Sequence, residues 1–323
     1  MALTLTEVQA ITNDYVLKKK AEDIVFQDSV LLYMLMNDGK FQDNLVTAGE
    51  LVDGGERIRV ILEYAKSNGG TYGNTTKIPQ AKVDILNAAR FRWAGAFGSN
   101  AIDLDDRRQN SGDAAIVDLV HAKVNSIRKT IRDTLGDQVY AQAVNGDALL
   151  GLGDLFETTT STPYGEIATD DMADWKANVI TTSEDMSFKV MQAIRRTAKV
   201  GQNKSDKPNL YITTDLMKDA YERTLTPAVR YQDTKLANAG FDNVLFGGVP
   251  VVADDKQSAG ILDALNTNYL NLKTHKDFAF TDIEWEGSRE QPDTWVANQR
   301  WSGQLVTSHR KAHCRHTNLT DPT

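Results

Sequence analysis

The chain has 323 residues, of which 41% are hydrophobic and 25% charged, a composition typical of a folded protein with one elaborated core or two. The formal net charge of −8 argues against a surface that grips nucleic acid, because such surfaces are basic. The single cysteine, Cys314, excludes an intrachain disulfide and favours a reducing compartment. The sequence shows no secretory signal at its start and no stretch of about 18 apolar residues that would cross a membrane.

Residues 2–46 mix short helical pieces with polar interruptions, and within them the first apolar cluster runs from Val30 to Met36. No apolar segment of comparable length lies nearby in the sequence. Such a cluster packs either on another part of the fold or on another subunit, and both alternatives are open. If the partner is another subunit, the candidate contact residues are Leu31, Tyr33 and Leu35.

Residues 53–99 show the alternation of β-strands, and the segment 57–66 is expected to place apolar and charged side chains on opposite faces. A return strand is expected from Val83 to Phe97, after a loop rich in turn residues. Ten strand residues span ~33 Å, and a two-stranded ribbon is only marginally stable alone. We therefore expect this arm to rest on a neighbouring molecule. Its candidate contact residues are Arg57, Arg59, Glu63, Gly69, Gly70, Tyr72 and Gly73.

Residues 111–146 predict one long amphipathic helix, because apolar side chains recur three or four residues apart. Such a helix would be about 45–50 Å long. Ser111 or Asp113 can cap its start, Asn145-Gly146 predicts its end, and Gly136 is a potential kink. The apolar stripe consists of Ile116, Val120, Val124, Ile127, Ile131, Leu135 and Val139.

The region 147–272 reads as a small sheet with helices packed on it. Helices are expected at 171–179, 187–200 and 215–225. Strands are expected at 210–213, 244–246 and 249–253. The chain then returns to strands, at 269–272, 278–285, 295–301 and 305–313, with a bulge at Thr281-Asp282. These later strands are the natural partners of the long helix, which makes 147–272 an insertion.

The residues that could carry chemistry do not form a convincing site. In an extended strand His309 and His313 would lie ~13 Å apart, too far to share one ion, and His316 would face the other side. The acids at 103, 105 and 106, and Asp254-Asp255, have no nucleophile at a suggestive spacing, so we expect solvated turn acids. His121 is expected to be structural. Neither a phosphate-binding glycine loop nor a nucleophile elbow is present. We predict no catalytic, cofactor or metal site.

The segment VLFGGVPVVADD at 244–255, followed by NYLNL at 268–272, resembles a pattern in the major capsid proteins of tailed bacteriophages. The order of parts is also similar, and it extends the resemblance over the whole chain. The resemblance implies an α+β, Hong-Kong-97-like capsid fold. Its parts would be an N-terminal arm (1–48), an extended β-hairpin loop (49–98), a peripheral domain with the spine helix 111–146 (99–146 and 273–323) and an inserted α/β axial domain (147–272).

The resemblance implies a non-enzymatic major capsid protein of the virion, assembled in the host bacterial cytoplasm. Pentamers and hexamers would close an icosahedral shell around double-stranded DNA, without sequence-specific binding and without a membrane. The arm before the hairpin is shorter than in family members that carry an internal scaffolding region, which implies a separate scaffolding protein. A portal and a decoration protein are further implied partners. The alternatives are an encapsulin-like nanocompartment shell with the same fold and a soluble metal-dependent hydrolase built on 147–272.

Overall fold

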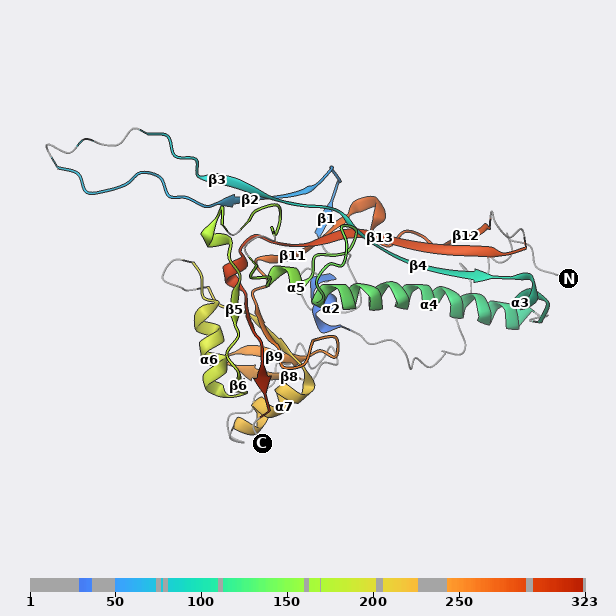
Figure 1. Cartoon of the computed structure of the whole chain (residues 1–323). Coiled ribbons are helices and arrows are strands. Elements are labelled where there is room, and N and C mark those ends of the chain that lie inside the picture. The colour runs from blue at the N-terminus through green and yellow to red at the C-terminus, as the bar shows by residue number, and fades with distance from the viewer. Residues whose placement is uncertain are drawn as a thin grey trace.

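A computed structural model describes most of the chain. The described residues form a long helix lying along a sheet, a second sheet flanked by helices, and a hairpin that projects from the rest (Figure 1). None of the described helices is long and apolar enough to cross a membrane. The described residues are 29–36, 50–73, 77, 81–109, 113–159, 163–168, 170–201, 206–225, 243–288 and 293–321.

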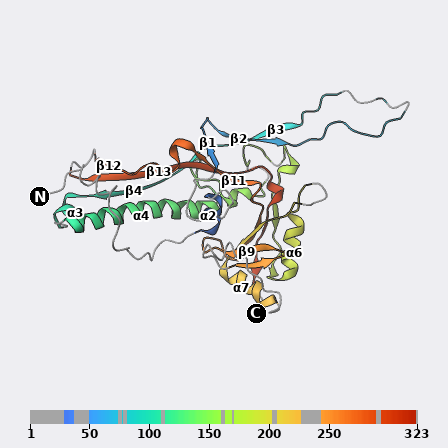
Figure 2. The same ribbon diagram turned by 180° about the vertical axis from the view of Figure 1, so that it is seen from behind.

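The long helix is α4, Asp113–Tyr140, and it packs on a five-stranded sheet (Figures 1 and 2). In this sheet β13 pairs antiparallel with β4, β12 and β11, and β1 pairs parallel with β11. The strands are β1 (Glu50–Val52), β4 (Ala94–Ile102), β11 (Leu270–His275), β12 (Glu284–Gly287) and β13 (Trp295–Thr307). A short helix, α3 (Leu104–Gln109), joins β4 to α4.

The apolar stripe of α4 faces this sheet and the central core. Six of its seven predicted members are at most 5% exposed; Ile116 lies in the helix, but its side chain is outside the described residues. Burial of such side chains stabilises the helix by about 1.5–3 kcal/mol each. The six are Val120, Val124, Ile127, Ile131, Leu135 and Val139.

The helix ends at Tyr140, earlier than the predicted end at Asn145-Gly146. The reason is the short helix α5, Leu152–Leu155, which packs against the last turn of α4. The Gly153 N–H donates to the Ala141 carbonyl (3.2 Å), and a Cβ on Gly151 would lie 2.3 Å from the Gln138 carbonyl oxygen. Only glycine permits this approach, and the Ala141 carbonyl, directly after α4, bonds to α5 rather than to a continued helix.

The second sheet has six strands in the order β5-β14-β10-β7-β9-β8. The predicted helices at 187–200 and 215–225 are present as α6 (Phe188–Thr197) and α7 (Asp215–Thr224). The strands are β5 (Asn178–Ile180), β7 (Leu210–Thr213), β8 (Asn243–Phe246), β9 (Val249–Ala253), β10 (Leu262–Leu265) and β14 (Cys314–His316). A separate two-stranded sheet pairs β6 (Glu184–Asp185), which follows β5 in the chain, with β15 (Leu319–Thr320), which follows β14.

Two predictions about this sheet are wrong. The predicted helix at 171–179 is instead a short 3-10 turn, η1 (Ala173–Trp175), followed by β5, because Trp175 is buried and its Nε1 donates to the Tyr164 carbonyl (2.9 Å). The assignment of all of 273–323 to the peripheral domain fails at residues 314–316, which do not join the sheet on α4. They pair with β10, where Arg315 forms a buried ion pair with Asp263 at 2.7 and 2.8 Å.

The strands after residue 269 also differ from the expected pattern. β13 is one continuous strand of 13 residues, where two were predicted. The predicted strand 278–285 is reduced to β12, since η4 (Lys276–Phe278) precedes it and Phe280 has a positive φ of 57°. The chain turns at η5, Arg310–Ala312, before it enters β14.

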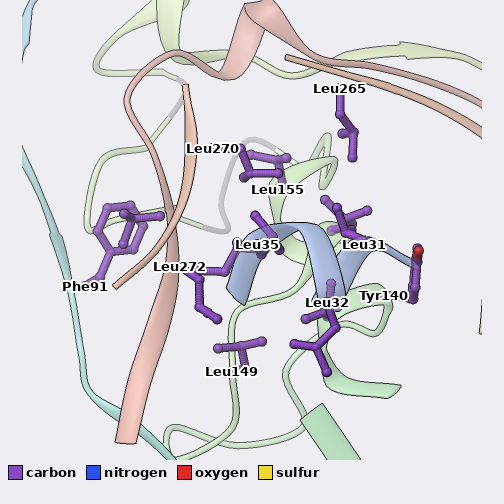
Figure 3. Close-up of a cluster of buried hydrophobic side chains, with 14 of the residues drawn as sticks. Leu31, Leu32, Leu35, Phe91, Tyr140, Leu149, Leu155, Leu265, Leu270 and Leu272 are labelled. Atoms are coloured by element: carbon purple, nitrogen blue, oxygen red, sulfur yellow. The ribbon is translucent and has the colours of Figure 1, made fainter. Parts of the chain in front are cut away.

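The N-terminal apolar cluster forms helix α2, Val30–Met36, which packs within its own chain. Figure 3 shows Leu31, Leu32 and Leu35 surrounded by apolar side chains from α4, α5, β10, β11 and the connection after α4. Leu31 and Leu35 are 0% and 4% exposed, and Tyr33 is half-buried. This burial contradicts the alternative in which Leu31 and Leu35 contact another subunit, because neither side chain reaches the surface.

Candidate assembly surface

The base of the hairpin is anchored to the loop 163–168. The hairpin pairs β2 (Ile58–Glu63) with β3 (Leu86–Phe91), so its strands are shorter than predicted. The Arg90 N–H donates to the Gly165 carbonyl (2.8 Å), and the rings of Phe91 and Tyr164 meet edge to face at 5.3 Å.

Arg57 belongs to the same anchor, because it forms an ion pair with Glu166. Arg57 was predicted to make a charged contact with a neighbouring molecule. Within the chain it is held against Glu166, and its contact with a neighbour stays a prediction. The backbone at Glu166 has a positive φ of 63°, directly after Gly165, which marks a tight turn at this anchor.

The two faces of the hairpin have different environments. The face toward the body is buried at Ile58, Leu62, Ala89 and Phe91. The opposite face, here called the outer hairpin face, consists of the cross-strand pairs Arg59–Arg90, Ile61–Ala88 and Glu63–Leu86.

Ile61 and Leu86 on the outer hairpin face are 74% and 62% exposed. Arg59 and Arg90 lie directly opposite each other, and like charges in that position are unfavourable. The outer hairpin face, with two exposed apolar side chains and two opposed arginines, is therefore a candidate contact surface.

Beyond Glu63 and Leu86 the two arms of the hairpin continue without a strand among the described residues, and they project away from the body (Figures 1 and 2). The Asn68 side chain donates to the Ala81 carbonyl (2.8 Å) and joins the two arms. Tyr72 is 73% exposed, and a Cβ added to Gly70 would meet no atom within 4 Å. The remaining predicted tip residues, Gly69 and Gly73, are exposed as well.

The histidines and the cysteine of the tail are structural. Because the chain turns at η5, the assumption of one straight strand through His309 and His313 is wrong. The His313 Nδ1 accepts from the Asn266 N–H (3.2 Å), and burial lowers the pKa of His313 to about 3, which keeps the ring neutral. Burial also raises the pKa of the Cys314 thiol to about 12, so it is a poor nucleophile. No group of three or more metal-ligating side chains gathers within the described ranges.

The expectation that Asp254 is a solvated turn acid is wrong, because the side chain is 2% exposed. It follows β9 directly and accepts hydrogen bonds from the Ser29 hydroxyl (3.0 Å), the Val30 N–H (2.8 Å) and the Tyr140 hydroxyl (2.7 Å). Asp254 therefore ties the start of α2 and the end of α4 to the inserted sheet. The only sequence signal was an acid placed immediately after an apolar strand.

The acids before α4 also have structural roles. Asp103 accepts the Asp106 N–H (2.8 Å) at the start of α3, and Asp106 pairs with Lys123 of α4 (2.6 Å). Arg310 was not singled out in the sequence, yet it is 2% exposed and donates to the carbonyls of Leu155 (2.6 Å), Trp175 (3.1 Å) and Glu157 (3.0 Å). These groups build the body that carries the hairpin.

No protein-family model matches the sequence, and no curated protein matches it. Among solved structures, the chain is similar to the capsid asymmetric unit of cyanophage A-1(L), with a TM-score of 0.66, 16% identity, and coverage of 94% of this chain and 97% of the other. The chain is also similar to the capsid of Myoviridae phage XM1, with a TM-score of 0.57, 10% identity, and coverage of 95% of this chain and 97% of the other.

The SrpI encapsulin complex of Synechococcus elongatus PCC 7942 is also similar, with a TM-score of 0.53, 10% identity, and coverage of 99% and 98%. In all three cases the similarity extends over nearly the whole of each chain. The chain therefore has the fold of bacteriophage capsid proteins, which the encapsulin shell shares.

Proposed function

We propose that the protein is the major capsid protein of a tailed bacteriophage, and that its copies form pentamers and hexamers that close an icosahedral shell around double-stranded DNA. The observation that carries the proposal is a hairpin that projects from a body with the capsid fold and exposes Ile61 and Leu86. The shell would be part of the virion and would assemble in the cytoplasm of the bacterial host. The role is structural and not enzymatic.

The parts of the chain take the corresponding roles. The N-terminal arm predicted at 1–48 lies, apart from 29–36, outside the described residues and stays a prediction. We assign 49–98 to the extended hairpin loop, and α4 with the five-stranded sheet to the peripheral domain. The inserted domain, first placed at 147–272, gains β14, because that strand pairs with β10, and loses 270–272, which belong to β11 of the five-stranded sheet. A separate scaffolding protein, a portal and a decoration protein are the further partners we propose.

Assembly would depend on many moderate contacts. The outer hairpin face of one copy would lie on a neighbour, covering its apolar side chains and providing a counter-charge to its arginines. A closed shell multiplies such contacts, so that loss of one subunit breaks several of them together. The net charge of −8 suits an inner wall that does not trap entering DNA, since a basic wall would bind phosphates and release counterions.

The test is assembly of purified protein, followed by size-exclusion chromatography and negative-stain microscopy, with and without the proposed scaffold. We expect Ile61→Asp to fold normally and to fail to form closed particles, because a carboxylate replaces an apolar contact. Val144→Asp is the matched control, since Val144 is 93% exposed and lies outside the hairpin. Deletion of residues 69–74 should have the same effect as Ile61→Asp. Normal particles from both hairpin variants would contradict the proposed contact.

The similarity to the encapsulin gives a second candidate, a nanocompartment shell filled with protein. The content of purified particles distinguishes the two functions. Particles from infected cells that contain double-stranded DNA support the capsid, whereas a protein cargo without DNA supports the nanocompartment. The alternative of a metal-dependent hydrolase has no supporting observation within the described residues.

A further inference from the structure

β4 is a long sheet edge that lacks the usual protection. Among the described residues this strand of nine residues pairs only with β13. Exposed edges are normally blunted by charged side chains, proline or bulges, because their free backbone groups invite another strand. The β4 sequence, AGAFGSNAI, contains no charged residue and no proline.

The register shows which β4 backbone groups point to the free edge. Arg300 of β13 lies opposite Phe97, and its N–H and C=O both bond to Thr281 (3.0 Å each), on the side away from β4. The Phe97–Arg300 pair is therefore the type that exchanges no hydrogen bonds, so the N–H and C=O of Phe97 face outward. Because the direction alternates along a strand, the same holds for Gly95, Ser99 and Ala101.

Contacts at the two ends of the edge confirm this direction and limit the open part. The Gly95 N–H donates to the Asp147 carbonyl (3.1 Å). At the other end the Ala101 N–H donates to the Asn100 side chain (2.8 Å), and the Ala101 carbonyl accepts from Lys123 Nζ (2.7 Å). Phe97 and Ser99 remain, in the part of the chain that the structure describes, as the two residues with both backbone groups open.

We propose that β4 is an interface between two copies of this chain, whose β4 strands pair antiparallel about a twofold axis at Gly98. Phe97 of one copy would then lie opposite Ser99 of the other, and each such pair exchanges two N–H···O bonds. The edge is self-complementary: its open donors and acceptors match their own symmetry copies, and its lack of charge avoids repulsion.

The surroundings of Gly98 fit a pairing that leaves α4 in place. A Cβ on Gly98 would lie 2.7 Å from the Ile127 carbonyl oxygen, so this side of β4 is filled by α4. The Phe97 side chain is on the opposite face, 71% exposed, where the partner strand would cover part of it. The inference rests on the proposed function in one respect, since it requires that copies assemble.

The direct test is hydrogen exchange of the wild-type chain before and after assembly. We expect the Phe97 and Ser99 amides to exchange at least about tenfold more slowly in particles than in the unassembled chain, because they become hydrogen-bonded only in the pair. Particles in which both amides exchange as in the free chain would overturn the pairing and leave the capsid function standing. Protection already present in the free chain would also overturn it, because a segment of the same chain would then cover the edge. If the wild type forms no particles, both proposals fall.

A variant pair tests the same contact by stability. Ser99→Pro removes the outward N–H without touching the ladder to β13, since proline is tolerated at a sheet edge. Ser99→Thr keeps the N–H and is the matched control. We expect both variants to have the thermal midpoint of the wild-type monomer, and only Ser99→Pro particles to dissociate at a lower urea concentration. Equal particle stability for the two variants would contradict the pairing.

Discussion

Substitution of Asp254 by alanine should undock α2 and loosen the junction between the long helix and the inserted sheet. One carboxylate oxygen accepts the Ser29 hydroxyl, the Val30 N–H and the Tyr140 hydroxyl, and the other accepts the Lys256 N–H (3.0 Å). Burial and the neighbouring carboxylate raise the pKa of Tyr140 well above its usual value, so its hydroxyl remains a donor.

The magnitude follows from what the substitution leaves behind. A hydrogen bond to a charged group contributes about 1.5–3 kcal/mol, but bonds that share one acceptor do not add in full. Removal of the carboxylate leaves the donors of Ser29, Val30 and Tyr140 without an acceptor in a dry site, at about 1–3 kcal/mol for each group left unsatisfied and about 3–5 kcal/mol together if part of the cost is relieved by reorientation. We therefore expect Asp254→Ala to lower the free energy of unfolding by an amount in that range.

Urea unfolding and amide exchange in α2 measure the effect. The Val30–Met36 amides should lose protection in Asp254→Ala ahead of the amides of α4, because α2 has lost the group that bonds its first N–H. Asp255→Ala is the matched control, since Asp255 is the adjacent acid and is exposed; we expect a change within about 0.5 kcal/mol. A loss below about 1 kcal/mol with α2 still protected would refute the account of this junction.

The remaining predictions concern the body of the subunit. Burial lowers the pKa of His313 from 6.5 to about 3, so the ring is neutral in the folded chain and takes up a proton in the unfolded chain below pH 6.5. The free energy of unfolding should therefore fall by about 1.4 kcal/mol per pH unit as the pH drops from 6.5 toward 3. His313→Gln should flatten that part of the plot of unfolding free energy against pH, and an unchanged slope would contradict it. Gly151→Ala should lower the thermal midpoint, because its Cβ would lie 2.3 Å from the Gln138 carbonyl oxygen. Gly70→Ala is the control and should leave the midpoint unchanged, since a Cβ there meets no atom within 4 Å. Equal midpoints for the two variants would refute the close-packing argument. Arg310→Met should cost at least about 3 kcal/mol in urea unfolding, since several buried carbonyls lose their donor, and a loss below about 1 kcal/mol would count against this role.

Local pattern was sufficient for the elements whose apolar spacing is regular. The stripe of α4 follows from apolar side chains that repeat with the period of a helix, and its six described members are buried. The positions of α6, α7 and β7 were also predicted, although Phe188 at the start of α6 is 46% exposed. The hairpin was recognisable for the same reason, although its ordered strands are shorter than the alternation suggested.

Contacts between distant segments decided the rest. Residues 171–179 lack a helix because Trp175 is held by Tyr164, and α4 stops where Gly151 and Gly153 let α5 approach. The cluster at Val30–Met36 could equally have served a neighbouring subunit, and its own chain buries it.

The candidate site divides in the same way. The exposed outer hairpin face could be anticipated from alternation, since every second residue of a strand faces the same side. That Arg57 pairs with Glu166, and that Asp254 bonds residues more than 200 positions away, could not. Periodicity along a chain reveals that a face is apolar or polar, but the partner of that face is set by segments that meet only when the tertiary structure forms.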